Sequence, residues 1–239
     1  MIDCHNHIGE PWGTRDRQTA RELIQKMDNN GIDKAVVFPF EYKNYDNEYT
    51  GKAVKEFSDR LIPFVMTSPV LEKKPDKVLR KYVEDKGFKG LVLYAPAHDY
   101  KMTSIGLLEP LFKVCEELKL PVFAYSGDEL YATPLHFVDI AQMFPSVNIV
   151  MLHSGFMQQT PEAIMVAERC PNIYLEHSSG ISMGVTTSIQ RLGPNRVVMG
   201  TNTPYWDFEV QLRKLEVAID DDETRCKVMG PNCLAILNL

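Results

Sequence analysis

The sequence predicts an α/β fold of the (β/α)8 type, a compact TIM barrel of eight parallel strands. Three observations support this prediction. Eight short apolar segments recur every 24 to 33 residues along the 239-residue chain. Helix-like amphipathic stretches lie between them, and a helix between successive strands is typical of a parallel sheet. The first segment lacks the G-x-G-x-x-G turn that typically follows the first strand of an open, doubly wound sheet.

The predicted strands are rich in β-branched and aromatic residues and nearly continuous in hydrophobicity, as expected for strands buried on both faces. In chain order they are residues 1–5, 34–38, 61–67, 88–94, 121–127, 148–154, 172–178 and 196–202. Eight strand-and-helix units fill a chain of this length with few insertions. We therefore expect a single domain over residues 1–239.

The predicted helices show apolar residues on one face. In TARELIQKMDNNG, Ala20, Leu23 and Met27 share a face, and Gly31 follows near the end. The same pattern indicates helices at 75–87, 107–120, 133–144, 160–170 and 207–219.

Composition excludes several classes of partner. The net charge is −6 and the Lys and Arg residues are scattered, so we expect no nucleic-acid partner. No apolar run approaches the roughly 20 residues of a membrane span, and the N-terminus lacks a signal-peptide pattern. The five cysteines are far apart and form no CxxC pair, which favours reduced thiols in a cytoplasmic protein.

Polar residues collect at the carboxyl ends of the predicted strands, where the active site of such a barrel lies. Five of the six histidines lie at or just beyond a strand end, whereas His136 lies in a helix-like segment. The strand-end residues are His5, His7, Tyr94, His98, Tyr125, His153, Glu176, His177, Asn202 and Tyr205. This clustering predicts a pocket that binds a cation or moves protons near neutral pH.

The first strand ends in His-Asn-His. Side chains two residues apart on a strand share a face, so His5 and His7 are expected to point together into the barrel mouth. Imidazole is a good ligand for zinc, iron, nickel and manganese. His5 and His7 are therefore the predicted metal ligands.

Several segments of the chain together resemble the amidohydrolase superfamily, specifically its amidohydrolase-related group. These segments are MIDCHNHIG, PVFAYSG, NIVMLHSG, NIYLEHSSG, RVVMGTNTPYWD and KVMGPNCLAIL. The group contains metal-dependent hydrolases and aminocarboxymuconate-semialdehyde-type decarboxylases. The resemblance implies a barrel with a metal at the carboxyl ends of its strands.

The family's ligand pattern is only partly present. His5, His7 and His153 match it, but Tyr125 stands where the strand-5 His would be and Asn202 where the strand-8 Asp would be. Asn cannot serve as a base near neutral pH, and the Tyr hydroxyl has a pKa of about 10. The expected alternatives are one divalent metal, zinc in the first place, and a metal-free site like that of the family's lactonase type.

The resemblance and the strand-end positions suggest further roles. His153 is the expected general acid or base, and Tyr125, His177 and Asn202 are the other candidate catalytic residues. Glu176 and His177 alternate along a strand, so at most one of them is expected to face the pocket.

The loops above the barrel mouth hold the candidate substrate-binding residues. Trp12, Arg15 and Tyr205 lie in loops that follow the first and last predicted strands. Arg15 is the candidate anchor for a substrate carboxylate, because Arg pairs well with carboxylates.

Three functions remain open from the sequence. The first is a hydrolase that cleaves a C–O or C–N bond of a small cyclic or carboxylated molecule. The second is a non-oxidative decarboxylase of a small unsaturated or aromatic acid. The third is a catalytically degenerate barrel that binds a small molecule. Family members often form dimers, so a homodimer is an expected assembly.

Overall fold

The computed structural model describes residues 1–11, 13–127 and 130–239. The strands in this part of the chain are β1 Ile2–His7, β2 Lys34–Phe38, β3 Leu61–Pro63, β4 Val65–Met66, β5 Leu91–Leu93, β6 Val122–Tyr125, β7 Ile149–Leu152, β8 Ile173–Glu176 and β9 Val197–Val198. Every strand pair is parallel. β3 and β4 occupy a single barrel position, so all eight predicted strands are present.

Backbone hydrogen bonds join the two sheets into a ring. Between the first and last strand positions, Cys4 N donates to Met199 O (3.0 Å) and Asn202 N donates to His5 O (2.8 Å). At the other junction, Phe64 N donates to Val37 O and Val65 N donates to Gly90 O, both at 2.9 Å. The predicted TIM barrel is therefore confirmed.

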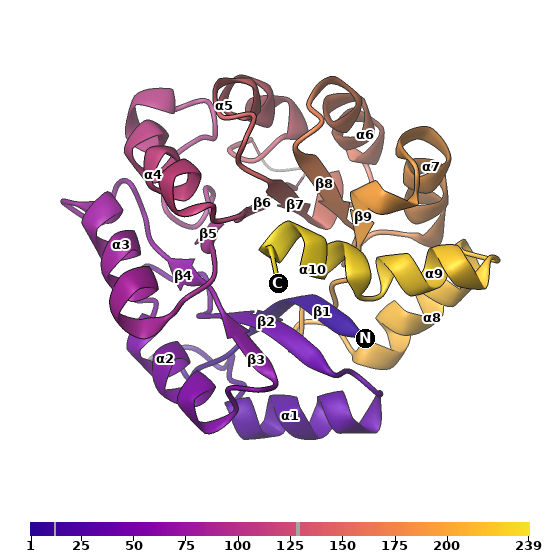
Figure 1. The fold of residues 1–239 in the computed structure, drawn as a ribbon, viewed down its shortest axis with the longest axis horizontal. Helices are drawn as coiled ribbons and strands as arrows, with labels where there is room; N and C mark the ends of the chain where they lie inside the picture. Colours follow the sequence, from indigo (N-terminus) through magenta and orange to yellow (C-terminus); the bar gives the residue numbers. More distant parts are fainter. Residues whose placement is uncertain (12, 128–129) are drawn as a thin grey trace.

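Helices surround the strands (Figure 1). The α-helices of the described residues are α1 Ala20–Asn29, α2 Asn47–Glu56, α3 Pro75–Lys86, α4 Ile105–Leu118, α5 Val138–Met143, α6 Thr160–Arg169, α7 Ser182–Leu192, α8 Phe208–Ala218, α9 Asp222–Val228 and α10 Pro231–Leu237. Short 3-10 turns are η1 Pro134–Phe137, η2 His153–Gly155 and η3 Pro194–Arg196. The apolar pattern did not indicate α2, α7 and α9, whose buried faces are short: three residues in α2, two in α7 and one in α9.

The last helix covers one end of the barrel. In Figure 1, α10 lies across the strands close to the N-terminus. Its Cys233, Ile236 and Leu237 join a buried cluster with Ile2 and Cys4 of β1. The opposite end, where the strands finish, is left for the polar residues.

Alternation along the strands determines which side chains face inward. In β8, Ile173 and Leu175 pack outward against the helix layer, which turns Glu176 toward the barrel interior. In β1, Cys4 belongs to the interior cluster. The pairing of β1 with β2 is irregular between Asp3 and Asn6, and this bulge interrupts the alternation of inward and outward side chains. Such a bulge re-aims side chains, and His5 and His7 point inward beyond it.

Among the described residues, the structure contains no helix with the length and apolarity needed to span a bilayer. All five cysteines are unpaired, and Cys226 is the exposed one.

Candidate metal centre

Three histidines meet at the carboxyl ends of the strands. His5 and His7 end β1, and His153 directly follows β7. The ring centroid of His5 lies 4.9 Å from that of His153 and 5.4 Å from that of His7. All three are buried, with at most 2% of their surface exposed. His153 and Ser154 have φ angles of 66° and 46°, so the chain turns sharply as it leaves β7.

The Nδ1 atom of each histidine faces a hydrogen-bond acceptor. His5 Nδ1 lies 3.0 Å from Glu176 Oε2, His7 Nδ1 lies 3.1 Å from Pro39 O, and His153 Nδ1 lies 3.2 Å from Ser178 O. A carboxylate and two carbonyls can only accept, so these partners assign the proton to Nδ1 in all three rings. Each Nε2 then carries a free lone pair, and within the described residues Nε2 of His5 and of His7 has no partner.

Glu176 is fixed by four donors. Its Oε2 accepts from His5 Nδ1, from His153 N (3.1 Å) and from Ser178 Oγ (2.8 Å), and its Oε1 accepts from Ser178 N. Burial alone would raise the pKa of Glu176, but the hydrogen bonds from His5 and from the backbone of His153 outweigh it and hold the pKa below its ordinary value. A Cβ at Gly200 would lie 2.7 Å from Glu176 Cδ, so glycine makes room for the carboxylate.

One group of donors has the spacing of a cation's ligands. His5, His153 and Glu176 each offer a donor atom within 4.8 Å of the other two. On the Nδ1 side, the Ser178 hydroxyl lies 3.3 Å from His5 Nδ1, 3.0 Å from His153 Nδ1 and 2.8 Å from Glu176 Oε2. Because this hydroxyl occupies the space beside the Nδ1 atoms of His5 and His153, a cation would bind at the Nε2 atoms, which carry the free lone pairs.

Burial keeps two of the imidazoles neutral. It lowers the pKa of His7 to about 4 and that of His153 to about 3. Metal ions bind the neutral ring, so these histidines are ready to bind a cation at pH 7. The same low pKa disfavours the protonated imidazole of His153 near neutral pH. The donor set fits a divalent cation, and imidazole nitrogen suits zinc and manganese alike.

Three other predicted residues lie beside the histidines. Tyr125 ends β6, with its ring centroid 5.2 Å from that of His153. Asn202 is buried, and its Oδ1 has no partner among the described residues. Tyr205 is 39% exposed, and its ring centroid lies 5.4 Å from that of His7.

The structure places His177 outside this cluster. The expectation that at most one of Glu176 and His177 faces inward is confirmed, with Glu176 inside. His177 instead packs against α7, where its Nε2 lies 2.8 Å from Ser188 Oγ. Arg15 is exposed in the loop after β1, and Trp12 lies outside the described residues.

Sequence reasoning missed Glu41 and Ser178. Glu41 Oε2 lies 3.5 Å from His7 Nδ1, and its Oε1 accepts a hydrogen bond from Tyr205 Oη at 3.0 Å. Glu41 follows β2 by only three residues, so the strand-end rule that selected the histidines would also have found it. Ser178 follows β8 in the same way.

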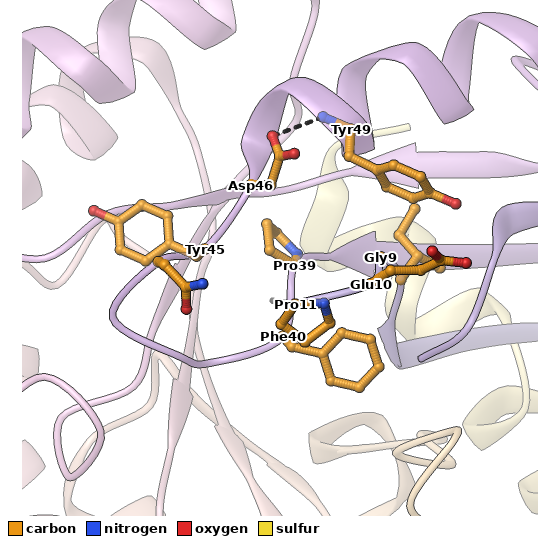
Figure 2. A pocket seen from close by; sticks show the side chains of 10 residues that line it. Gly9, Glu10, Pro11, Pro39, Phe40, Tyr45, Asp46 and Tyr49 are labelled. Carbon is orange, nitrogen blue, oxygen red and sulfur yellow. Dashed lines mark hydrogen bonds between the residues drawn. The ribbon is translucent and has the colours of Figure 1, made fainter. Parts of the chain in front are cut away.

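A cavity of about 280 Å³ lies between the loops that follow β1 and β2. Figure 2 shows Gly9, Glu10 and Pro11 from the first loop and Pro39 and Phe40 from the second. Phe40 also stacks on the His7 ring, with centroids 5.4 Å apart. Phe40 therefore lies between the cavity and the histidine cluster. None of the three histidines lines the cavity.

Solved structures share the fold over their whole length. A putative amidohydrolase from Staphylococcus aureus is 17% identical, with a TM-score of 0.79, and the match covers 100% of this chain and 99% of that one. A probable 2-pyrone-4,6-dicarboxylic acid hydrolase from Acinetobacter baumannii is 12% identical, with a TM-score of 0.77 and coverage of 100% and 99%. A dihydroxybenzoic acid decarboxylase from Polaromonas, with bound manganese, is 13% identical, with a TM-score of 0.79 and coverage of 100% and 96%. At these identities the likeness establishes the fold.

Sequence comparison gives a family. No curated protein matches the chain. The model of the family described as Amidohydrolase matches residues 2–239, which confirms the resemblance seen in the strand-end motifs. The chain therefore belongs to the amidohydrolase family.

Proposed function

We propose that this protein is a metal-dependent hydrolase that cleaves a C–O or C–N bond of a small cyclic molecule. The observation that supports this most strongly is the set of three imidazoles whose Nδ1 atoms all face acceptors, which leaves each Nε2 lone pair free. A divalent cation bound there supplies Lewis-acid chemistry, because it polarises a carbonyl and lowers the pKa of water.

The proposed ligands are His5 and His153, which belong to the closely spaced group of donors, and His7, whose Nε2 atom also lacks a partner among the described residues. Glu176, the carbonyl of Pro39 and the carbonyl of Ser178 hold the three rings in the required tautomer, as partners of metal-binding histidines usually do. This differs from the prediction of His5 and His7 alone, because the low pKa of His153 suits a ligand better than a proton donor. The sequence favoured zinc, but the Polaromonas decarboxylase holds manganese, so both ions belong in the tests.

Aromatic side chains line the surroundings of the proposed ligands. Phe40 stacks on His7, and Phe156 stacks on His153 with centroids 4.8 Å apart. Tyr94 lies 5.9 Å from His7 and 5.0 Å from Tyr125, measured between ring centroids. Such walls favour a small planar substrate.

Asn202 is the proposed contact for a substrate oxygen. Its amide is neutral, so it can donate a hydrogen bond to that oxygen but cannot accept a proton from water near neutral pH. Arg15 is exposed in the loop after β1, and Glu41 places a carboxylate beside His7. Because the Glu41 carboxylate would repel an anionic substrate, an uncharged cyclic substrate such as a lactone suits this part of the mouth.

Decarboxylation of an aromatic acid is the second candidate. The specific observation in its favour is the aromatic lining, which would stack on a planar aromatic ring. The related decarboxylase with bound manganese adds support at the level of the fold.

Isotope labelling separates the two reactions. Protein loaded with Mn²⁺ would be incubated with lactones, esters and amides in H₂¹⁸O, and in parallel with aromatic acids. Hydrolysis predicts one ¹⁸O in the product, whereas decarboxylation predicts release of CO₂. The double variant His5→Ala/His7→Ala should lose the activity, and His136→Ala, which changes a partly exposed histidine in η1, should keep it. Turnover that survives the double variant, or no turnover of either panel, would contradict the proposal.

A further inference from the structure

Glu41 contacts both a proposed metal ligand and the mouth of the barrel. Its Oε2 lies 3.5 Å from His7 Nδ1, and its Oε1 accepts from Tyr205 Oη at 3.0 Å. The Glu41 side chain is 23% exposed, but Oε2 itself is buried and forms no hydrogen bond within the described residues. One carboxylate thus bridges the end of β1 and the loop after β9.

Each histidine of the His-Asn-His motif has a carboxylate oxygen beside its Nδ1 atom. His5 has Glu176 Oε2 beside Nδ1 at 3.0 Å, and His7 has Glu41 Oε2 beside Nδ1 at 3.5 Å. In His7 the hydrogen bond itself goes to Pro39 O, and the Glu41 carboxylate adds its charge to the same face of the ring.

A carboxylate in this position strengthens a metal ligand. Negative charge beside the Nδ1 proton raises the electron density at Nε2 and fixes the orientation of the ring. Asn202, at the strand-8 position, brings no charge to the cluster, and Glu176 is already committed to four donors. Glu41 is the carboxylate whose Oε2 stays uncommitted beside the proposed ligands.

We propose that Glu41 is a positioning residue of the cation site, which strengthens His7 as a ligand and fastens Tyr205 above it. The ring centroid of Tyr205 lies 5.4 Å from that of His7, so the hydroxyl contact with Glu41 keeps this exposed ring over the site. The inference rests on the proposed function, because it requires that His7 bind a cation.

Titration with Mn²⁺, followed by electron paramagnetic resonance, tests the role directly. Glu41→Gln keeps the shape of the side chain and an acceptor for Tyr205, but it removes the charge. We expect the Kd for Mn²⁺ to rise by about 10- to 100-fold, the usual cost of losing a partner of a metal-binding histidine. Glu10→Gln removes an exposed carboxylate from the neighbouring cavity wall and should change the Kd less than about 2-fold. An equal Kd for Glu41→Gln and the parent protein would overturn the inference.

A second measurement separates this inference from the proposed function. If the parent protein binds no Mn²⁺, the proposed cation site is wrong. The ¹⁵N resonances of His7 in metal-free protein still report its surroundings, and Glu41→Gln should shift them while those of His5 stay in place. Unchanged His7 resonances would count against Glu41 as its partner. Thermal unfolding verifies that the variant stays folded, so a general loss of structure cannot produce the selective shift.

Discussion

His5 Nδ1 lies 3.0 Å from Glu176 Oε2, and both side chains are completely buried. This contact joins β1 to β8, which lie on either side of β9 in the barrel, and the same carboxylate accepts from the backbone of His153. Because Glu176 fixes both histidines, the geometry of the proposed cation site depends on a residue that need not touch the cation.

Replacing Glu176 with Gln should strongly destabilise the protein. Gln keeps one acceptor oxygen but turns an NH₂ group toward donors that the carboxylate now accepts. We expect a loss of about 3 kcal/mol in the free energy of unfolding, measured by urea denaturation. Glu168→Gln, which breaks an exposed pair with Arg191, should cost less than about 1 kcal/mol. Similar stabilities for the two variants would show that the hydrogen bonds to Glu176 do not hold this site together.

Gly200 should tolerate no side chain. A Cβ there would lie 2.7 Å from both Cγ and Cδ of Glu176, which its four donors hold in place. Gly200→Ala should therefore cost about 1–3 kcal/mol of stability, as overpacking does, and should also weaken Mn²⁺ binding. Gly106→Ala is the matched control, because a Cβ at Gly106 in α4 meets nothing within 4 Å. If both alanine variants behaved alike in a thermal melt, the close packing around Glu176 would be unimportant.

Asn202→Asp should strengthen cation binding. The change places a carboxylate at the strand-8 position, beside the proposed ligands and with almost no change in shape. We expect the Kd for Mn²⁺ to fall at least about 10-fold, because an anionic oxygen is a better ligand for a hard cation than an amide oxygen. Calorimetric titration measures the change. A Kd that stays the same or rises would place Asn202 outside the cation's reach.

Acid should destabilise the metal-free protein partly through His177. Burial lowers the pKa of His177 to about 4, with the charges of Glu176 and Lys214 as smaller influences. In the unfolded chain the ring has a pKa of about 6.5. The contribution of the neutral, buried ring to the free energy of unfolding is therefore fully present above pH 6.5 and is lost as the pH falls toward 4.

The variant His177→Gln isolates this effect, since Gln can still hydrogen-bond Ser188. Between pH 7 and pH 5, the parent protein should lose about 2 kcal/mol more stability than the variant. Urea denaturation at both pH values gives the two losses. Burial raises the pKa of Asp3 to about 6, so acid favours the folded state through this residue. This effect is the same in the parent and the variant, so it does not alter the difference between them. Equal losses in the two proteins would mean that His177 is not buried as a neutral ring.

The barrel and the histidine cluster could be predicted because both follow from periodic patterns. Apolar runs marked all eight strand positions, and the spacing of His5 and His7 placed them on one face. Strand alternation limited Glu176 and His177 to one inward residue, but alternation alone could not say which. The packing of Leu175 against the helix layer determines the answer, and such tertiary contacts are not visible in a single strand.

Other features depend on contacts between distant segments. The proximity of Glu41 to His7 joins the ends of two strands, and no sequence spacing records how near their side chains come. The irregularity within β1 that turns His5 inward arises from pairing with β2, so it too was hidden in the sequence.

The stoichiometry of cation binding tests the central claim most directly. Metal-free protein would be titrated with Mn²⁺ and with Zn²⁺ alongside the His5→Ala/His7→Ala variant and the His136→Ala control. We predict about one equivalent for the parent and the control and none for the double variant, because the free Nε2 atoms of β1 are the proposed ligands. Absence of binding by the parent, or one equivalent retained by the double variant, would contradict a cation site built on these histidines.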